Sequence, residues 1–221
     1  MKDRADIYFE TLMEEPAKYI SDLEKQAQQN EVPIIRRATR DLLRYLLTVH
    51  KPKRILEVGT AIGYSALFMK DCLEETATID TIEKVPARIS EAKENFQKYD
   101  KRGQITLYEG EAAEVLKGLM EEGKCYDLIF MDAAKGQYMN FLSSVLAMMR
   151  PGSVLVSDNI LHNGDVLQSR YAVTRRDRTI HSRMREYLYT LTHHPNLTTL
   201  CLSLGDGVTI STFCDTKEGT R

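Results

Sequence analysis

The sequence has few cysteines and no long apolar run. Its four cysteines lie far apart and form no Cys-x-x-Cys pair, which argues against a zinc site, a redox motif or a disulfide framework: Cys72, Cys125, Cys201 and Cys214. No apolar stretch has the length of a secretion signal or a membrane span. The net charge of −2 gives no general attraction to nucleic acid. We therefore expect a soluble, cytoplasmic protein with no membrane partner.

The length and composition suit one folded domain. The chain has 221 residues, of which 43% are hydrophobic, enough for a core of ordinary size. No repeat, low-complexity tract or interdomain linker divides it. We predict a single domain over residues 1–221, in which residues 1–50 form a helical N-terminal extension. Apolar residues at helical spacing predict two helices there, the second ending near His50.

From residue 54 onward, short β-branched or apolar runs alternate with amphipathic segments. Strands are expected at 54–58, 78–83, 105–108, 127–132 and 153–157, with helices between them at 63–73, 86–100, 111–121 and 137–149. This alternation predicts an α/β fold with a parallel, doubly wound sheet. After a helix near 181–192, expected strands at 198–203 and 208–213 flank Leu-Gly-Asp-Gly and should form a terminal hairpin.

The most distinctive local feature is a strand, turn and helix with the sequence ILEVGTAIGYS at 55–65. Gly59 and Gly63 either let a ligand approach the backbone or only allow tight packing of the strand and helix. Glu83 ends the next strand, where an acid can bind both hydroxyls of a ribose, although a solvated glutamate is the alternative. Gly-x-Gly-x-x-Gly is absent, which disfavours nicotinamide and flavin cofactors. S-adenosylmethionine, which has a ribose but no phosphate, fits this pattern better.

Polar side chains follow two further strands. Asp132 ends one predicted strand, and Asp158 and Asn159 follow the next. The carboxyl ends of parallel strands lie on one rim, so the three side chains can converge as oxygen ligands for Mg²⁺ or Mn²⁺. Each also has an ordinary explanation as a helix cap or turn residue. Lys135 lies three residues after Asp132 and is a candidate general base, unless it is simply solvated.

A basic segment precedes the terminal hairpin. Between residues 170 and 185 a single acid accompanies six arginines: Arg170, Arg175, Arg176, Arg178, Arg183 and Arg185. Charge alone favours a solvated loop. Four histidines lack metal-ligand spacing and are interpreted as loop or surface residues: His162, His181, His193 and His194. Three tyrosines could stack on a nucleobase, but ordinary packing is favoured for each: Tyr64, Tyr138 and Tyr171.

Taken in order, these motifs resemble the metal-dependent class I O-methyltransferases, the family of catechol and caffeoyl-CoA O-methyltransferases. The similar segments are ILEVGTAIGYSALFM, DAAKGQY, SDN and LGDGVTIS. The resemblance implies a Rossmann-like, seven-stranded, mostly parallel sheet with an antiparallel terminal hairpin, and usually a homodimer. It also implies a set of S-adenosylmethionine contacts: Glu57, Gly59 and Ser65 at the methionine part, Glu83 at the ribose and Ala112 near the adenine.

The resemblance assigns further roles around the reaction centre. It implies that Asp132 serves both cofactor and metal, that Asp158 and Asn159 complete the metal site, and that Lys135 is the base. Asp132 and Lys135 would thus be the catalytic pair. Ile35 stands where relatives often place a methionine over the cofactor.

One branch of the family is especially similar. TAIGYSALFM, DAAKGQY and above all RRDRTIHSRMREY resemble the enzymes that methylate 5-hydroxyuridine at the tRNA wobble position to 5-methoxyuridine. The 5-hydroxyl and the adjacent carbonyl oxygen form a vicinal pair, as in catechol. The six arginines would then contact phosphates of the anticodon loop. The alternatives are a catechol or hydroxycinnamoyl O-methyltransferase, in which the arginines belong to an ordinary lid, and a non-catalytic nucleic-acid-binding protein, which would not need the rim acids.

Overall fold

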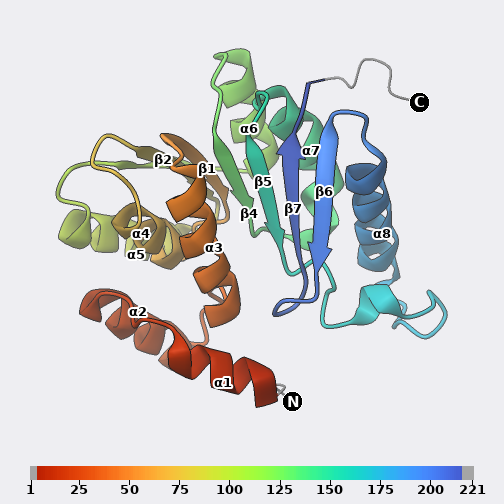
Figure 1. The fold of residues 1–221 in the computed structure, drawn as a ribbon, viewed down its shortest axis with the longest axis horizontal. Coiled ribbons are helices and arrows are strands. Elements are labelled where there is room, and N and C mark those ends of the chain that lie inside the picture. The colour runs from red at the N-terminus through yellow and green to blue at the C-terminus, as the bar shows by residue number, and fades with distance from the viewer. Residues whose placement is uncertain (1–3, 216–221) are drawn as a thin grey trace.

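The computed structural model describes residues 4–215 and contains a single seven-stranded sheet (Figure 1). Its strands are β1 (Arg54–Val58), β2 (Thr78–Glu83), β3 (Ile105–Glu109), β4 (Leu128–Met131), β5 (Val154–Asp158), β6 (Leu197–Leu202) and β7 (Val208–Phe213). The spatial order is β3-β2-β1-β4-β5-β7-β6. Strands β1 to β5 pair in parallel, whereas β7 is antiparallel to both β5 and β6. The predicted fold class, including the terminal hairpin, is confirmed.

Helices connect the strands at the predicted places. They are α1 (Arg4–Leu12), α2 (Lys18–Gln29), α3 (Arg37–His50), α4 (Tyr64–Asp71), α5 (Pro86–Tyr99), α6 (Ala112–Glu121), α7 (Tyr138–Ala147) and α8 (Arg178–His193), with short 3₁₀ turns η1 (Lys135–Gln137) and η2 (Asp165–Leu167). From α4 to α8 their ends differ from the expected positions by at most three residues. Within residues 4–215, no helix combines the length and apolarity that a membrane crossing requires.

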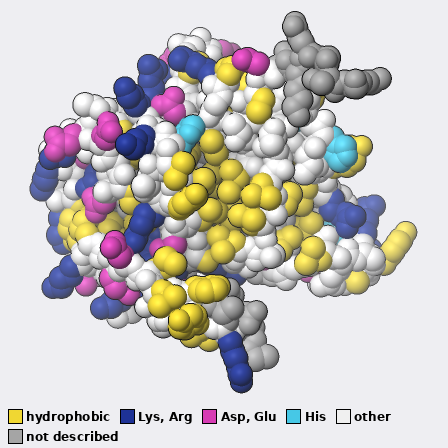
Figure 2. Space-filling model, viewed as in Figure 1, with side chains coloured by type: hydrophobic (Ala, Val, Ile, Leu, Met, Phe, Trp, Pro, Cys, Tyr) yellow, Lys and Arg dark blue, Asp and Glu magenta, His cyan; other side chains and the backbone are white. Residues whose placement is uncertain are grey.

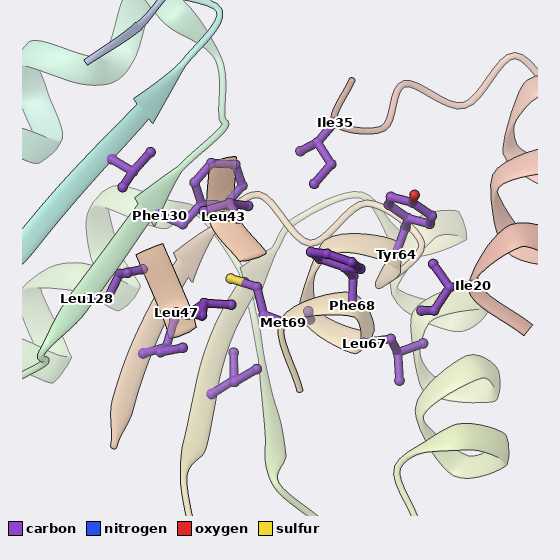
Figure 3. Close-up of a cluster of buried hydrophobic side chains, with 14 of the residues drawn as sticks. Ile20, Ile35, Leu43, Leu47, Tyr64, Leu67, Phe68, Met69, Leu128 and Phe130 are labelled. Atoms are coloured by element: carbon purple, nitrogen blue, oxygen red, sulfur yellow. The ribbon is translucent and has the colours of Figure 1, made fainter. Parts of the chain in front are cut away.

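The two faces of the sheet carry separate hydrophobic clusters. Side chains alternate along β4, so Leu128 and Phe130 point to one face and Ile129 and Met131 to the other. The first face packs against α2, α3 and α4, and Figure 3 shows Phe130 in this cluster near Leu43 of α3. The second face packs against α6, α7 and α8. Because both faces are covered, β4 is apolar throughout, as is typical of a central parallel strand.

Residues 4–50 of the N-terminal region contain three helices rather than the predicted two. Helix α1 ends at Leu12 and α2 begins at Lys18, with Pro16 in the connection. Proline disfavours a helical conformation in the residue before it, which explains the break. The apolar spacing continues across the break and conceals it in the sequence. The predicted helix end near His50 agrees with the end of α3.

Candidate active site

A cavity of about 510 Å³ lies at the carboxyl ends of β1, β2 and β4. Most of the predicted site residues line it: Ile35, Gly59, Ser65, Glu83, Ala112, Asp132, Lys135 and Asn159. The side chains of Glu57 and Asp158 lie behind this wall, with 0% and 1% of their surface exposed. The predicted residues therefore do surround a cavity at the expected rim of the sheet. Most of them face this cavity, whereas Glu57 and Asp158 are buried behind its wall.

Glu57 is one of the supporting residues. Its carboxylate accepts hydrogen bonds from the hydroxyls of Ser65 and Thr81, the latter at 2.5 Å. Thr81 has only one hydroxyl proton, so in the 2.6 Å contact between Thr60 and Thr81 it is Thr60 that donates. Burial raises the pKa of Glu57 to about 7. Ser65 and Thr60 line the cavity. Glu57 orients the hydroxyl of Ser65 directly and that of Thr60 through Thr81.

The two glycines of the turn after β1 are needed for packing. A Cβ on Gly59, whose φ is +111°, would lie 2.1 Å from the backbone oxygen of Asp132. A Cβ on Gly63 would lie 2.5 Å from the ring of Phe96. Both distances are far shorter than a van der Waals contact, so tight packing accounts for both glycines. Gly59 also lines the cavity, so its backbone is within reach of a ligand.

Glu83 is held in place rather than solvated. One carboxylate oxygen accepts the N–H of Ala61 at 2.9 Å, and the other accepts the N–H groups of Lys84 and Val85 at 2.9 and 3.0 Å. The side chain therefore joins the loops that follow β1 and β2. A carboxylate offers roughly four acceptor positions, so capacity remains for a ligand in the cavity. This geometry suits the predicted contact with a ribose.

The loops after β4 and β5 meet at Asp132. Lys135 donates from Nζ to Oδ1 of Asp132 at 2.8 Å, and Asn159 donates from its amide to the same oxygen at 3.1 Å. Met131 and Ser157 are paired in register on the two strands, so the loops leave the sheet side by side. Lys135 is thus tied to the rim and is not an ordinary solvated lysine.

Asp158 is buried with one carboxylate oxygen unsatisfied. Its Oδ1 accepts hydrogen bonds from the backbone N–H of Asn159 at 2.8 Å and from the hydroxyl of Thr39 at 3.2 Å. Its Oδ2 has no hydrogen-bond partner among the described residues. Burial, followed by repulsion from Asp132, raises the pKa of Asp158 to about 6. Buried carboxylate oxygens normally have a hydrogen-bond donor or a cation as partner, so we expect a bound partner at Oδ2.

This donor set fits a divalent cation. Asp132 and Asp158 offer carboxylate oxygens and Asn159 offers an amide oxygen, the ligand types that Mg²⁺ and Mn²⁺ prefer. A cation would satisfy Oδ2 of Asp158 and relieve the repulsion between the two carboxylates. Among residues 4–215, no group of three or more His, Cys, Asp or Glu side chains is placed to hold a metal. The site predicted here consists of two carboxylates and one amide, and metal binding stays a prediction.

Tyr138 lies beneath these residues, at the start of α7. Its hydroxyl lies 3.0 Å from the backbone oxygens of both Met131 and Asp158, and 3.4 Å from Nζ of Lys135. Its ring is fully buried and packs edge to face on Tyr187, with 5.3 Å between ring centroids. Burial raises the pKa of Tyr138 well above its usual value, which keeps the hydroxyl neutral. This tyrosine cannot stack on a nucleobase.

The loop after Asn159 also lines the cavity. The backbone is left-handed at His162 and Asn163, with φ of 50° and 57°. The turn between β6 and β7 holds this loop, because both carboxylate oxygens of Asp206 lie 2.9 Å from the N–H of Asn163. A side chain on Gly207 would collide with Leu161 at 2.5 Å. The packing of this turn on the loop therefore requires a glycine at position 207.

Several cavity residues have no signal in the sequence. Arg36 precedes α3 and Arg88 lies on α5, and both line the cavity together with His162, Asn163 and Asp206. Of these, only Asp206 belongs to a motif named above, the LGDG turn, and nothing in that motif indicates a place in the cavity wall. Only the packing of separate segments brings the five residues together. His162 lies in a loop, as predicted, and this loop forms part of the cavity wall. His181 is 3% exposed on the buried face of α8, so its interpretation as a loop or surface residue was wrong.

The structure divides the six arginines into two groups. One group donates hydrogen bonds to backbone oxygens and consists of Arg178, Arg183 and Arg185. The other three, Arg170, Arg175 and Arg176, are exposed, as are Arg183 and Arg185, and Arg176 lies 3.9 Å from a carboxylate oxygen of Asp177. Arg183 donates to the backbone oxygen of Gly136 at 2.8 Å, which places the start of α8 beside the turn that carries Lys135. Tyr171, within the exposed segment, is 89% exposed, so the packing interpretation was wrong for this tyrosine.

Comparisons with known proteins identify the family of this chain. A family model described as O-methyltransferase matches residues 10–213. A catechol O-methyltransferase of Niastella koreensis is 34% identical over 126 residues, so the match spans little more than half, 57%, of either chain. O-methyltransferase ankF of Aspergillus thermomutatus is 30% identical over 182 residues, which cover 75% of this chain and 73% of that protein.

A solved structure supports the same assignment. The SAH-bound methyltransferase PaMTH1 of Podospora anserina is 26% identical, has a TM-score of 0.84 and matches over 96% of both chains. The family model covers nearly all of the described residues, including both loops that meet at Asp132. The chain therefore belongs to the O-methyltransferase family.

Proposed function

We propose that this protein is an S-adenosylmethionine-dependent O-methyltransferase that uses Mg²⁺ or Mn²⁺ and methylates 5-hydroxyuridine at the wobble position of tRNA. The observation that carries the reaction class is the meeting of Lys135 and Asn159 on one oxygen of Asp132, at the edge of the cavity that Glu83 lines. The similarity to a catechol O-methyltransferase and to an SAH-bound methyltransferase supports the same class.

The cavity offers complementary groups for S-adenosylmethionine. Glu83 has acceptor capacity for the ribose hydroxyls. The hydroxyl proton of Ser65 is directed to Glu57, so the lone pairs of Ser65 are available to the α-ammonium group. Ile35 and Ala112 line the wall and offer apolar contacts. S-adenosylmethionine supplies an electrophilic methyl group on a positively charged sulfur.

Lys135 is the proposed base. As a neutral amine it takes the proton from the substrate hydroxyl, whose oxygen then forms the bond to the methyl carbon while the electrons of the broken C–S bond stay on sulfur. Asp132 holds Nζ of Lys135 at 2.8 Å. Asp132, Asp158 and Asn159 would hold a divalent cation, whose positive charge would favour the ionised hydroxyl. Positioning and charge, rather than a covalent enzyme intermediate, provide the acceleration.

The exposed segment before α8 supports an RNA substrate. Arg170, Arg175 and Arg176 lie in solvent, and Tyr171 among them is 89% exposed. Exposed arginines beside an aromatic ring suit phosphates and unstacked bases of a single-stranded loop. This segment leads directly into α8, whose Arg183 donates a hydrogen bond to Gly136 in the turn that carries the proposed base. Because the net charge is −2, a local basic patch of this kind has to supply the attraction.

We also propose that the protein forms a homodimer through the open face of β5, β7 and β6. Figure 1 shows none of the described helices in front of these strands, and Figure 2 shows hydrophobic side chains gathered on this side of the molecule. Leu197 packs in the cluster that includes α8, so Leu200 points to the opposite, open face and is 54% exposed. Tyr45 and Val49 on α3 are each 65% exposed. A second copy would bury such apolar surface.

A small-molecule substrate is the second candidate. The name of the Niastella koreensis relative favours it, and the same lysine, acids and cavity would serve a catechol or hydroxycinnamoyl compound. The deciding experiment measures methyl transfer from labelled S-adenosylmethionine to 5-hydroxyuridine-containing tRNA and to a simple catechol in parallel. Labelling of tRNA that EDTA or Lys135→Ala abolishes supports the proposal. Efficient labelling of catechol alone contradicts the tRNA assignment.

A further inference from the structure

The proposed base has a long, flexible side chain that must be held still to meet a substrate oxygen. A lysine has four rotatable methylene groups, so its position depends on partners for Nζ. Nζ of Lys135 lies 2.8 Å from Oδ1 of Asp132 and 3.4 Å from the hydroxyl of Tyr138. Its side chain is 18% exposed. A single ion pair would leave Nζ free to swing around Asp132, whereas two partners limit its position.

We propose that Tyr138 is a positioning residue, whose hydroxyl holds Nζ of Lys135 where it can accept the proton of the substrate hydroxyl. This inference rests on the proposed function, which gives Lys135 its role as base. Tyr138 itself does not line the cavity and would not touch the substrate.

The hydroxyl of Tyr138 is itself held in place by the backbone. It lies 3.0 Å from the backbone oxygens of Met131 and Asp158, at the ends of β4 and β5. A phenol has one proton and can also accept, so the proton serves a backbone oxygen and a lone pair accepts from Lys135. Asp132 follows one of these strand ends and Asp158 lies at the other. Tyr138 thereby sets the position of Lys135 relative to the same strand ends that carry the proposed metal ligands.

Packing alone does not explain a tyrosine at this position. A phenylalanine would fill the same space and keep the ring contact with Tyr187. It would also keep Nζ of Lys135 over the ring, at 5.5 Å from the centroid. What the hydroxyl adds is its link between two strand ends and Lys135.

Tyr187→Phe provides a matched control for Tyr138→Phe. Tyr187 is also fully buried and touches Tyr138, but its hydroxyl pairs with that of Ser157 at 2.6 Å. Each variant therefore removes one buried, hydrogen-bonded hydroxyl. Thermal unfolding should show losses of similar size, since such bonds contribute comparable amounts to stability. Only Tyr138→Phe removes a partner of Lys135.

The first measurement does not depend on the reaction. Nuclear magnetic resonance of ¹⁵N-labelled lysine reports the order of the Lys135 side chain in the wild type and in both variants. We expect the order to fall in Tyr138→Phe and to remain in Tyr187→Phe. Unchanged order in Tyr138→Phe, or an equal fall in both variants, overturns the proposal. A fall in order together with a wild type that methylates neither tRNA nor catechol contradicts the proposed function and supports the positioning role.

The second measurement separates turnover from binding. With an active substrate, Tyr138→Phe should lower kcat on the order of 10-fold and change KM by less than about twofold, because misplacement of the base affects the chemical step. Tyr187→Phe should leave kcat within about twofold. In a Lys135→Ala background, adding Tyr138→Phe should cause no further loss, as expected when one residue acts through the other. An undiminished kcat in Tyr138→Phe, or an additive loss in the double variant, overturns the proposal.

Discussion

The hydroxyl of Thr39 donates a hydrogen bond to Oδ1 of Asp158 at 3.2 Å, across 119 residues of sequence. Both side chains are almost completely buried, with 0% and 1% exposure. This bond connects α3, in the N-terminal helical region, with the end of β5. It orients the carboxylate so that Oδ2 is left without a partner among the described residues, and so the N-terminal helices help to shape the proposed metal site.

Replacing Thr39 with valine should weaken metal binding. Valine keeps the shape of the side chain but removes the donor to Asp158, and loss of such a supporting bond typically lowers metal affinity by about 10- to 100-fold. Titration calorimetry with Mn²⁺ measures this affinity directly. Thr39→Ser keeps the hydroxyl and should bind nearly as well as the wild type. Equal affinity of the valine variant and the wild type would show that Thr39 does not support the site.

The raised pKa of Glu57 predicts that the free energy of unfolding depends on pH. Its pKa is about 7 in the folded protein and near 4.5 when the chain is unfolded. The folded state therefore holds this proton more tightly, so its contribution to stability is complete below pH 4.5 and is lost as the pH rises through 7. A shift of this size corresponds to about 3 kcal/mol.

Glu57→Gln should remove this dependence, because an amide does not titrate. The difference in unfolding free energy between the wild type and Glu57→Gln, measured by urea denaturation between pH 4.5 and 8, should fall as the pH rises. Glu94→Gln on the exposed part of α5 is the control and should follow the wild type. A constant difference between wild type and Glu57→Gln across this range would contradict the raised pKa.

The exposed arginines predict a salt-dependent loss of RNA binding. Arg175→Ala combined with Arg176→Ala should lower tRNA affinity on the order of 10-fold at low salt. The slope of log affinity against log salt concentration should become less steep by roughly one to two, since each phosphate contact contributes nearly one to that slope. Binding of S-adenosylmethionine should stay the same. Fluorescence anisotropy with labelled tRNA, repeated at several salt concentrations, measures both quantities.

An equally basic pair elsewhere controls for net charge. Lys101 and Arg102 are exposed before β3, at the edge of the sheet opposite the cavity. Their double alanine variant should bind tRNA like the wild type. Equal losses in the two double variants would mean that total charge, and not the segment before α8, governs binding.

Leu200→Glu should separate the proposed dimer. A charge on the open face of β6 would be buried without a partner when a second copy covers that face, which is strongly unfavourable. Sedimentation velocity should therefore show a dimer for the wild type and a monomer for Leu200→Glu. Leu167→Glu, at a 73% exposed position in η2, should remain dimeric. A monomeric wild type would contradict the homodimer itself.

Much of the fold follows from local patterns. The alternation of strand and helix segments, the glycine turn after β1 and the hairpin around LGDG each depend on residues close together in the chain. The rim position of Asp132 and Asp158 could also be predicted, because the carboxyl ends of parallel strands lie at one edge of a sheet. The break at Pro16 was missed because the apolar spacing continues across it.

By itself, the sequence determined the α/β fold class, the family resemblance and the residues placed at the rim, since these depend on short-range periodicity and on strand ends. The tertiary structure alone decided that Glu57 supports Ser65 from behind the cavity, that Thr39 reaches Asp158 and that Tyr171 is exposed. Hydrogen-bond partners and burial depend on how distant segments pack, and the pattern of apolar and polar residues along one segment does not specify which distant side chain it will meet.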